Sequence, residues 1–255
     1  MDSLKKSNKG FSLVELMIAM VASLLIVASL FYSVIGDLKA YESARGTQNL
    51  VAKSRMSVNT LRLYIQQAGF RDIEALKANT VYDADVSAAT IWNWEAGQIM
   101  QGTTSSATIT DNKTDSDIIA LRFSGAATDG IVSCAGDDIA SAVMHEITLY
   151  VDDHDQLRCR DNTDAALILD EAVEFLELMY GTTDNPTRYF SANDVADWSS
   201  VNRIKVGLLL SQEVSANHLE NNNSYTLFNH TVSAANDTNY RTVVVETVII
   251  ENQGG

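Results

Sequence analysis

The sequence has 255 residues, of which 46% are hydrophobic and 20% are charged, and its formal net charge is −15. This length is sufficient for one domain with its own core. The net negative charge argues against a nucleic acid or an anionic lipid surface as the main ligand. The sequence also has no cluster of lysine or arginine residues that would form a local basic patch. We therefore expect no nucleic-acid partner.

A long apolar segment lies near the N-terminus. Leu16 to Ile35 are 20 consecutive residues without a charge, which is the length that an α-helix needs to cross a bilayer core. Lys5, Lys6 and Lys9 precede this segment, so the N-terminus is predicted to stay in the cytoplasm while the rest of the chain is exported. Residues 11–36 are predicted to form a transmembrane helix.

The polar leader, residues 1–10, does not follow the pattern of a secretory signal peptide. Such a peptide is cleaved after its apolar segment, next to small residues. Here the leader ends before the apolar segment, at Gly10, and Phe11 is followed four residues later by Glu15. The run Lys-Gly-Phe-Ser-Leu-Val-Glu-Leu resembles the processing site of type IV prepilins and pseudopilins. The resemblance implies that a prepilin peptidase cuts between Gly10 and Phe11 and methylates the new amine of Phe11.

Glu15 needs a physical reason for its position beside the bilayer core, where a carboxylate costs about 2.5–3.5 kcal/mol on insertion scales. In the family that the motif resembles, this glutamate meets the N-terminal amine of a neighbouring subunit. A buried charge with a partner is tolerated, and the pair fixes the axial register of the filament. Glu15 is therefore predicted to be a subunit-registering carboxylate. The alternative is a glutamate that extends to the membrane interface.

The helix is predicted to continue as an amphipathic second half over residues 37–69. This segment has no proline and only Gly46 as a weak breaker, and Ala68-Gly69 indicates a C-terminal cap. Spacings of three and four residues predict one apolar face, with Gln67 on the opposite side. The predicted face consists of Val51, Ser54, Val58, Leu61, Ile65 and Ala68.

A second and smaller apolar stripe lies away from this face. Met56, Leu63 and Phe70 are seven residues apart, so they share one side of a helix. Two interpretations stay open. Either the globular domain covers enough of the helix to bury these side chains, or they form a contact to a neighbouring pilin subunit.

Residues 70–255 are predicted to form an exported globular α+β domain. Residues 71–116 show little pattern, but five later segments are rich in strand-forming residues. These segments are 117–124, 144–151, 173–180, 204–210 and 242–250, with a tight hairpin over 151–157 and a short helix over 191–199 that Ser191 would cap. A long helix followed by strands with short connections predicts an antiparallel sheet, and the sequence leaves open whether there are one or two.

Cys134 and Cys159 are the only cysteines. Because the domain is predicted to enter an oxidising compartment, a disulfide between them is the preferred interpretation. A zinc site would need two further ligands, and the four histidines are scattered. Asp111, Asp115 and Asp117 could bind Ca²⁺, but their spacing does not match an EF-hand loop, so a solvated turn is predicted.

Motifs of common enzyme classes are missing from the sequence. There is no GxSxG nucleophile motif, no HExxH zinc motif and no glycine-rich phosphate-binding loop. We therefore expect neither an enzymatic activity nor a cofactor.

Segments outside the leader resemble PilW-type minor pilins. These are Ser54 to Phe70, which closes on Ala-Gly-Phe, then Ile131 to Cys134, Leu157 to Cys159, Met179 to Gly181, Trp198 to Val206, and Tyr240 to Asn252. The resemblance implies a pilin-like fold, and other minor pilins and the major pilin as partners. It also implies a role in a complex that primes type IV pilus assembly, located in the inner membrane and then in the pilus. The alternatives are a GspJ-like minor pseudopilin of a type II secretion system and a pilin that binds a surface or DNA.

Overall fold

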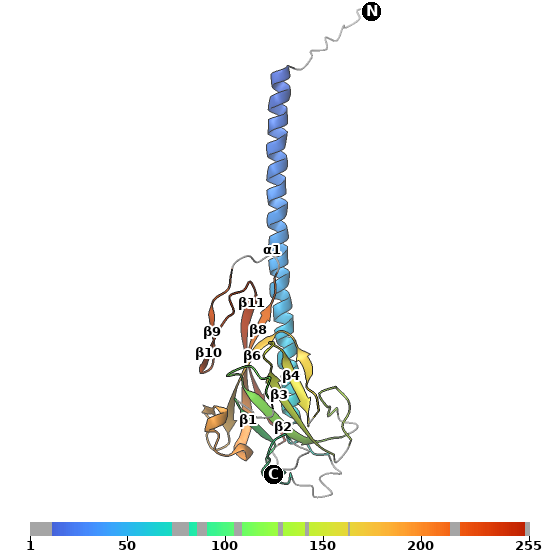
Figure 1. Ribbon diagram of the computed structural model, residues 1–255, viewed down its shortest axis with the longest axis vertical. Coiled ribbons are helices and arrows are strands. Elements are labelled where there is room, and N and C mark those ends of the chain that lie inside the picture. Colours follow the sequence, from blue (N-terminus) through green and yellow to red (C-terminus); the bar gives the residue numbers. More distant parts are fainter. Residues whose placement is uncertain are drawn as a thin grey trace, which may run out of the picture. The chain divides into compact units, whose positions relative to one another are not determined.

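The structure is a computed structural model that describes residues 12–72, 82–85, 91–104, 109–126, 130–140, 143–162, 164–214 and 220–252. It contains one helix of 55 residues, α1 (Leu13–Gln67), which is followed by antiparallel strands (Figure 1). This arrangement confirms the predicted α+β class. The chain divides into two compact units, Met1–Arg45 and Gly46–Gly255, and α1 supplies residues to both.

The second half of α1 buries one face in the core of the second unit. Ser54, Val58, Leu61, Ile65 and Ala68 are buried, as predicted. The prediction is wrong at two other positions of this helix. Val51 was predicted on the buried face but is exposed, and Gln67 was predicted on the opposite side but is buried.

Val51 is 45% exposed, and Leu50 is buried in its place. Leu50 lies four residues after the buried Gly46, so it continues the same helix face, whereas Val51 is turned by about 100° from it. Gly46 is a close-packing position, because a Cβ at this residue would lie 2.4 Å from Val214 Cγ2. Gln67, predicted on the solvent side, is buried because its Oε1 accepts a hydrogen bond of 2.6 Å from the Val132 backbone N–H.

The helix ends at Gln67, next to the predicted cap. Gly69 has φ 73°, the left-handed conformation that glycine adopts without a steric cost. Its backbone N–H donates to the Arg122 carbonyl at 2.9 Å, and a Cβ here would clash with the Asn252 carbonyl. The cap therefore also joins the helix to a strand and to the C-terminal segment.

Five antiparallel strands form the first sheet, and they lie in chain order. They are β1 (Met100–Thr103), β2 (Ile118–Ser124), β3 (Met144–Val151), β4 (Leu157–Asp161) and β5 (Leu167–Asp170). The long strands β2 and β3 match predicted segments, and β3 and β4 enclose the predicted hairpin bend. The short strands β1 and β5 were not predicted.

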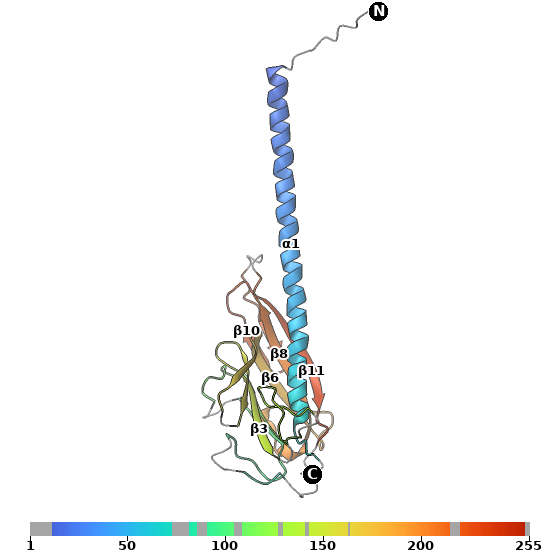
Figure 2. The same cartoon turned by 90° about the vertical axis from the view of Figure 1, so that its right-hand side faces the viewer.

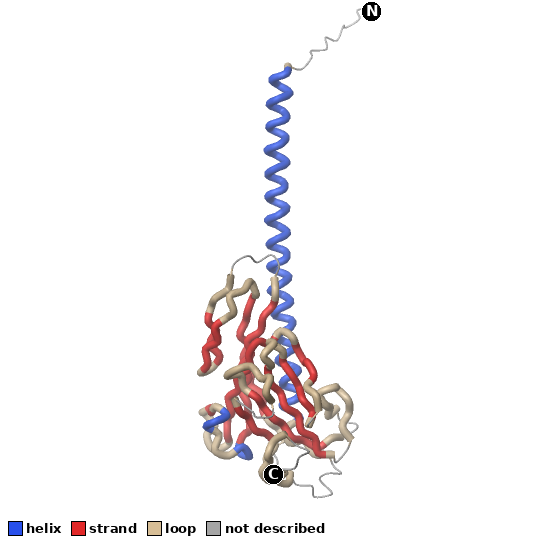
Figure 3. Tube along the Cα trace, viewed as in Figure 1, coloured by secondary structure: helices blue, strands red, loops and turns tan. Residues whose placement is uncertain are grey.

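A second sheet has four strands in the order β11-β8-β6-β7, and a separate two-stranded sheet consists of β9 and β10. Figure 3 shows the strands in red. The strands are β6 (Val173–Thr182), β7 (Tyr189–Phe190), β8 (Val201–Gln212), β9 (Ser224–Leu227), β10 (His230–Ser233) and β11 (Tyr240–Ile249). The described residues thus form three sheets, more than the one or two that the sequence left open.

The predicted helix over residues 191–199 is wrong. Two short 3₁₀ helices occur instead, η1 (Ala192–Asp194) and η2 (Trp198–Ser200). Ser191 Oγ donates to Asp194 Oδ2 at 2.7 Å and makes no capping bond to the backbone. Asp197 caps η2 by accepting from the Ser199 N–H. A cap residue alone does not specify helix length, and here each helix ends after three residues.

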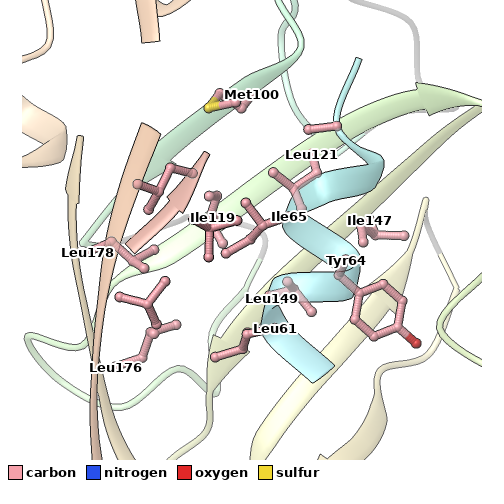
Figure 4. Close-up of a cluster of buried hydrophobic side chains, with 14 of the residues drawn as sticks. Leu61, Tyr64, Ile65, Met100, Ile119, Leu121, Ile147, Leu149, Leu176 and Leu178 are labelled. Atoms are coloured by element: carbon pink, nitrogen blue, oxygen red, sulfur yellow. The ribbon is translucent and has the colours of Figure 1, made fainter. Parts of the chain in front are cut away.

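One core joins the second half of α1 to both larger sheets. Figure 4 shows side chains of α1 facing those of β2, β3 and β6: Leu61, Tyr64 and Ile65 lie against Ile119, Leu121, Ile147, Leu149, Leu176 and Leu178. Full burial of each such aliphatic side chain contributes about 1.5–3 kcal/mol. This burial is the main reason why the last turns of α1 belong to the globular unit.

Polar side chains just before β2 bond to the backbone of β6. Ser116 Oγ contacts the Leu176 backbone N and O, each at 3.1 Å, and Asp117 Oδ2 accepts from the Leu178 N–H at 2.6 Å. Burial raises the pKa of Asp117 to about 7, and burial together with the nearby Asp117 charge raises the pKa of Glu177 to about 7. Two carboxyl groups with raised pKa values therefore lie at the junction of the two sheets.

We expect Asp117 to make the domain less stable as pH rises. A raised pKa means that the folded state binds the proton more tightly, so this stabilisation is present below the ordinary pKa, about 4, and is lost as pH rises through about 7. Asp117→Asn keeps an acceptor for the Leu178 N–H. The variant should gain about 2–3 kcal/mol relative to the natural chain between pH 5 and pH 8. Urea unfolding of both chains at these two pH values measures the gain, and an unchanged difference would contradict the assignment.

Arg122 organises the described part of the segment before β1. Its side chain is buried and donates to the main-chain carbonyls of Asp83, Glu95 and Gln98. The guanidinium carbon also lies 4.9 Å from the ring centre of Trp94, whose Nε1 donates to Glu146 at 2.5 Å. One buried arginine thus orders a stretch that has little regular secondary structure.

Candidate functional site

The start of α1 contains a side-chain cap, in which Glu15 bonds back to the residue before the helix. Ser12 precedes the first helical residue, and its carbonyl accepts from the Leu16 N–H at 3.1 Å. The Glu15 Oε2 atom accepts from the Ser12 N–H at 2.9 Å. Ser-x-x-Glu is the capping-box pattern, in which the glutamate satisfies the N–H of the cap residue. The sequence carried this signal at 12–15, but we did not predict it. Glu15 therefore has a structural role before any partner is considered.

The predicted cleavage residues Gly10 and Phe11 lie outside the described residues. Ser12, only two residues after Gly10, is described, and its bond to Glu15 involves no atom of the leader. Removal of residues 1–10 therefore removes neither atom of this bond.

From Leu13 to Ile35, the large apolar side chains of α1 are exposed. By length and composition this helix is apolar enough to cross a membrane, with a mean hydropathy of 2.5 over its most apolar window. Ser23 and Ser29 lie within the apolar stretch, and their hydroxyl groups donate to the Met20 and Ile26 carbonyls at 2.9 and 2.7 Å. These polar groups are thus satisfied within the helix, as a lipid environment requires.

The stripe of Met56, Leu63 and Phe70 is divided in the structure. Met56 is 67% exposed and Leu63 is 66% exposed, whereas Phe70 is partly buried against the core. The first two side chains remain candidates for a subunit contact, while Phe70 contributes to the domain. A surface cavity of about 320 Å³ lies beside Leu63, between the end of α1 and residues 130–132. Gln67 is one of the residues that line this cavity, and its Nε2 atom has no hydrogen-bond partner among the described residues.

Leu63→Lys is expected to reduce pilus assembly without unfolding the domain. The side chain is exposed, so the change in unfolding free energy should stay within about 0.5 kcal/mol. A lysine would prevent apolar contact at this position. Ile168→Lys, which changes an exposed aliphatic residue of β5 in the same way, is the matched control. The stability of the full chain in detergent and the number of surface pili decide the outcome, and a domain that unfolds would show that Leu63 belongs to the core.

The predicted disulfide between Cys134 and Cys159 is present, with 5.5 Å between the two Cα atoms. It fastens the segment after Ile131 to β4. Asp161 supports the same segment, because its carboxylate accepts from the Cys134 N–H at 2.9 and 3.0 Å. The Tyr64 hydroxyl, on α1, donates to the Ser133 carbonyl at 3.2 Å. The loop that borders the cavity beside Leu63 is therefore held by covalent and polar contacts together.

The three aspartates considered as a Ca²⁺ site have separate structural roles. Asp111 accepts from the Tyr150 hydroxyl at 3.1 Å, Asp115 is exposed with φ 63°, and Asp117 is buried against β6. The predicted solvated turn is therefore wrong at Asp117. Its backbone and side chain bond to β6, and this draws it into the core.

One other acidic cluster lies in the described part of the chain, at Asp152, Asp153 and His154. The Asp152 carboxylate accepts from the backbone N–H groups of His154 and Gln156 at 3.0 and 2.9 Å, and from Arg158 Nε at 2.6 Å. These bonds shape the hairpin between β3 and β4, which is the role that the sequence predicted for this segment.

Cationic and aromatic side chains gather at one place on the four-stranded sheet. Lys205 Nζ lies 4.7 Å from the ring centre of Tyr189 and 5.7 Å from that of Phe228, and the Arg203 guanidinium lies 5.1 Å from the Tyr189 ring. Arg203 also donates to main-chain carbonyls between residues 182 and 188, so it holds that loop. The sequence shows no such cluster because its members are far apart along the chain. The absence of a nucleic-acid partner stays a prediction.

Family comparisons match both ends of the chain. Residues 5–31 match the model of the prokaryotic N-terminal methylation motif, and residues 142–252 match the model of type IV pilus-assembly protein W. The chain is a minor pilin of the PilW type. It takes part in type IV pilus assembly, and the motif indicates processing by a prepilin peptidase and pilin partners.

The two matches cover different functional features of this PilW-type pilin. The methylation motif includes Gly10, Phe11 and Glu15. The PilW match extends from β3 to the end of β11 and includes Cys159, but it does not include Cys134 or the second half of α1. The resemblance noted for Ser54 to Phe70 thus lies outside both matches.

A comparison with curated proteins finds no match. Among solved structures, the type IV-like pilin TTHA1219 from Thermus thermophilus is similar, with 15% identity over 80% of this chain and 98% of that chain, and a TM-score of 0.47. This similarity is too low to establish a shared fold.

Proposed function

We propose that this minor pilin joins other minor pilins in a membrane-anchored complex that primes the type IV pilus and then stays at the pilus tip. The observation that carries the proposal is the combination of a prepilin methylation motif and a PilW domain in one chain. Its chemistry is non-covalent, and no enzymatic step is proposed.

The proposed anchor is residues 11–36 in the inner membrane, with the basic leader on the cytoplasmic side. A prepilin peptidase would remove residues 1–10 and methylate Phe11. Two observations support this arrangement: the apolar side chains of this part of α1 are exposed, and the hydroxyl groups among them bond to the helix itself. Such a surface is stable in lipid and equally stable against other apolar helices.

Glu15 is proposed to pair with the N-terminal amine of a neighbouring pilin. Within the described residues its Oε2 atom accepts from the Ser12 N–H. A carboxylate has a second oxygen with its own lone pairs, so Oε1 can accept from an amine without loss of the cap. The capping bond would then hold the carboxylate at the start of the helix, which is where a neighbour's N-terminus has to be recognised.

The experiment is deletion of the gene, followed by counting of surface pili and assay of secreted proteins in the same cells. Complementation with Glu15→Gln is the sharpest variant, because glutamine at this position still caps the helix but carries no charge. We expect the deletion to lose pili with secretion intact, the natural chain to restore them, and Glu15→Gln to restore them poorly.

Other outcomes assign other functions. Intact pili with blocked secretion would overturn the proposal in favour of a minor pseudopilin of a type II secretion system. Pili and secretion that are both unchanged would also overturn it and favour a surface-binding role. Full complementation by Glu15→Gln would show that Glu15 acts as a cap and not as a charge.

A further inference from the structure

Strand β11 is a long, regular edge strand. It pairs with β8 from Tyr240 opposite Gln212 to Ile249 opposite Arg203 without a register shift. Among the described residues no strand pairs with its other side, and β11 lies at the margin of the four-stranded sheet (Figure 2). In an antiparallel pair, every second residue points its N–H and C=O groups away from the neighbour. β11 therefore presents a row of backbone donors and acceptors to any further strand.

The other strands at sheet edges are short or covered. β7 has two residues, and β1 and β5 have four each, with a register shift between β4 and β5. The part of β6 that β7 does not reach is bonded by Ser116 and Asp117. Short strands, bulges and covered backbone are the usual means by which proteins prevent pairing at an edge. β11 has ten residues and none of these protections.

Charge does not protect β11 either. Its two charged residues, Arg241 and Glu246, pair inside the unit, Arg241 with Glu174 and Glu246 with Arg62 of α1. The remaining eight residues are uncharged, and seven of them are valine, isoleucine or threonine. An incoming strand would thus meet no unpaired charge along this edge.

Apolar surface lies beside the free backbone. Val245 and Ile249 are on one face of β11 and are 48% and 64% exposed. On the other face, at the start of β11, a cavity of about 370 Å³ lies between the strand and α1. Leu50, Val51, Tyr225 and Tyr240 are among its lining residues. A strand added to β11 would place alternate side chains over Val245 and Ile249 and toward this cavity.

We propose that β11 is the docking edge for an extended strand of another pilin, which would add to the sheet as a fifth strand. The added strand would carry few charges and apolar residues at alternate positions, because these complement the uncharged edge, the exposed Val245 and Ile249, and the cavity. Main-chain hydrogen bonds give such an addition its affinity, and the side-chain contacts give its specificity. The inference rests on the proposed function, since that function supplies other pilins at the same membrane.

The test uses the full chain in cells that assemble pili. Val245→Lys with Ile249→Lys places two charges on the exposed face of β11. Leu167→Lys with Ile168→Lys makes the same change on β5, where the two side chains have similar exposure. A photo-crosslinking phenylalanine analogue at Thr247, an exposed residue of β11, captures whatever lies beside the edge. Thermal unfolding of each variant in detergent confirms that it folds.

We expect the β11 variant to reduce surface pili at least about tenfold, which corresponds to a loss of about 1.4 kcal/mol in docking, while the β5 variant stays near the natural level. We also expect the probe at Thr247 to form an adduct with another processed pilin through an extended segment. The β11 variant should abolish the adduct.

Three outcomes overturn the inference. They are an equal effect of the two variants, an adduct formed only with a second copy of this chain, and no pilin adduct at all. If deletion of the chain abolishes pili but the β11 variant restores them fully, the docking edge is wrong and the proposed function stands. If deletion has no effect on pili, the proposed function itself fails.

Discussion

Replacement of Arg241 by methionine is expected to lower the unfolding free energy of the globular unit by about 3–5 kcal/mol, the usual cost of breaking a buried ion pair. The side chain is 1% exposed. Its Nε and Nη2 atoms donate to both oxygens of Glu174 at 2.7 and 2.9 Å, and Nη1 and Nη2 donate to Asp237 at 2.7 and 2.6 Å. Methionine would leave the buried Glu174 carboxylate without this partner.

The pKa values support the same network. Hydrogen bonding to Arg241 lowers the pKa of Asp237, and bonding to Asp237 raises the pKa of Arg241. Arg241 lies at the start of β11, so the network fixes the end of the strand proposed as a docking edge.

Urea unfolding of the full chain in detergent, followed by the fluorescence of its three tryptophans, measures the loss. The double variant Arg241→Met, Glu174→Leu removes both charges and should recover much of it, because an apolar pair replaces an ion pair at little cost. A loss below about 1 kcal/mol for Arg241→Met would show that the network adds little to stability.

The second large effect is expected from the disulfide. Cys134→Ala with Cys159→Ala should lower the unfolding free energy by roughly 3–4 kcal/mol in the chain-entropy model, since the two cysteines are 25 residues apart. The bonds of Asp161 and Tyr64 to the loop around Cys134 remain, so the loop is expected to keep its folded position at low denaturant.

Reduction of the natural chain provides the control. A reductant should lower the stability of the natural chain to that of the double variant and should not change the double variant. Equal stability of the natural chain with and without reductant would contradict a stabilising disulfide.

The sequence predicted the elements that have a local pattern. The long apolar and amphipathic helix and the strands β2, β3, β6, β8 and β11 were found because runs of β-branched and apolar residues mark them. The cysteine pair was found because the sequence has only two cysteines and the domain is predicted to be exported. These features depend on residues that are close together or unique.

Features that depend on distant contacts were missed. Gln67 is polar, and only the Val132 N–H explains its burial. Arg122 orders the segment around Trp94 through main-chain carbonyls, which leave no trace in side-chain identity. The edge position of β11 follows from strand order, and its sequence reads like that of a central strand. The Ser12–Glu15 cap is different, since its local pattern was present and was overlooked.

The most direct test of the proposed role is the position of the chain on the filament. Sheared pili from cells with an epitope-tagged chain that restores piliation are labelled with gold and examined by electron microscopy. The proposed priming and tip complex predicts label at one end of each labelled filament. Label spread along the filaments, or pili that carry none, would contradict it.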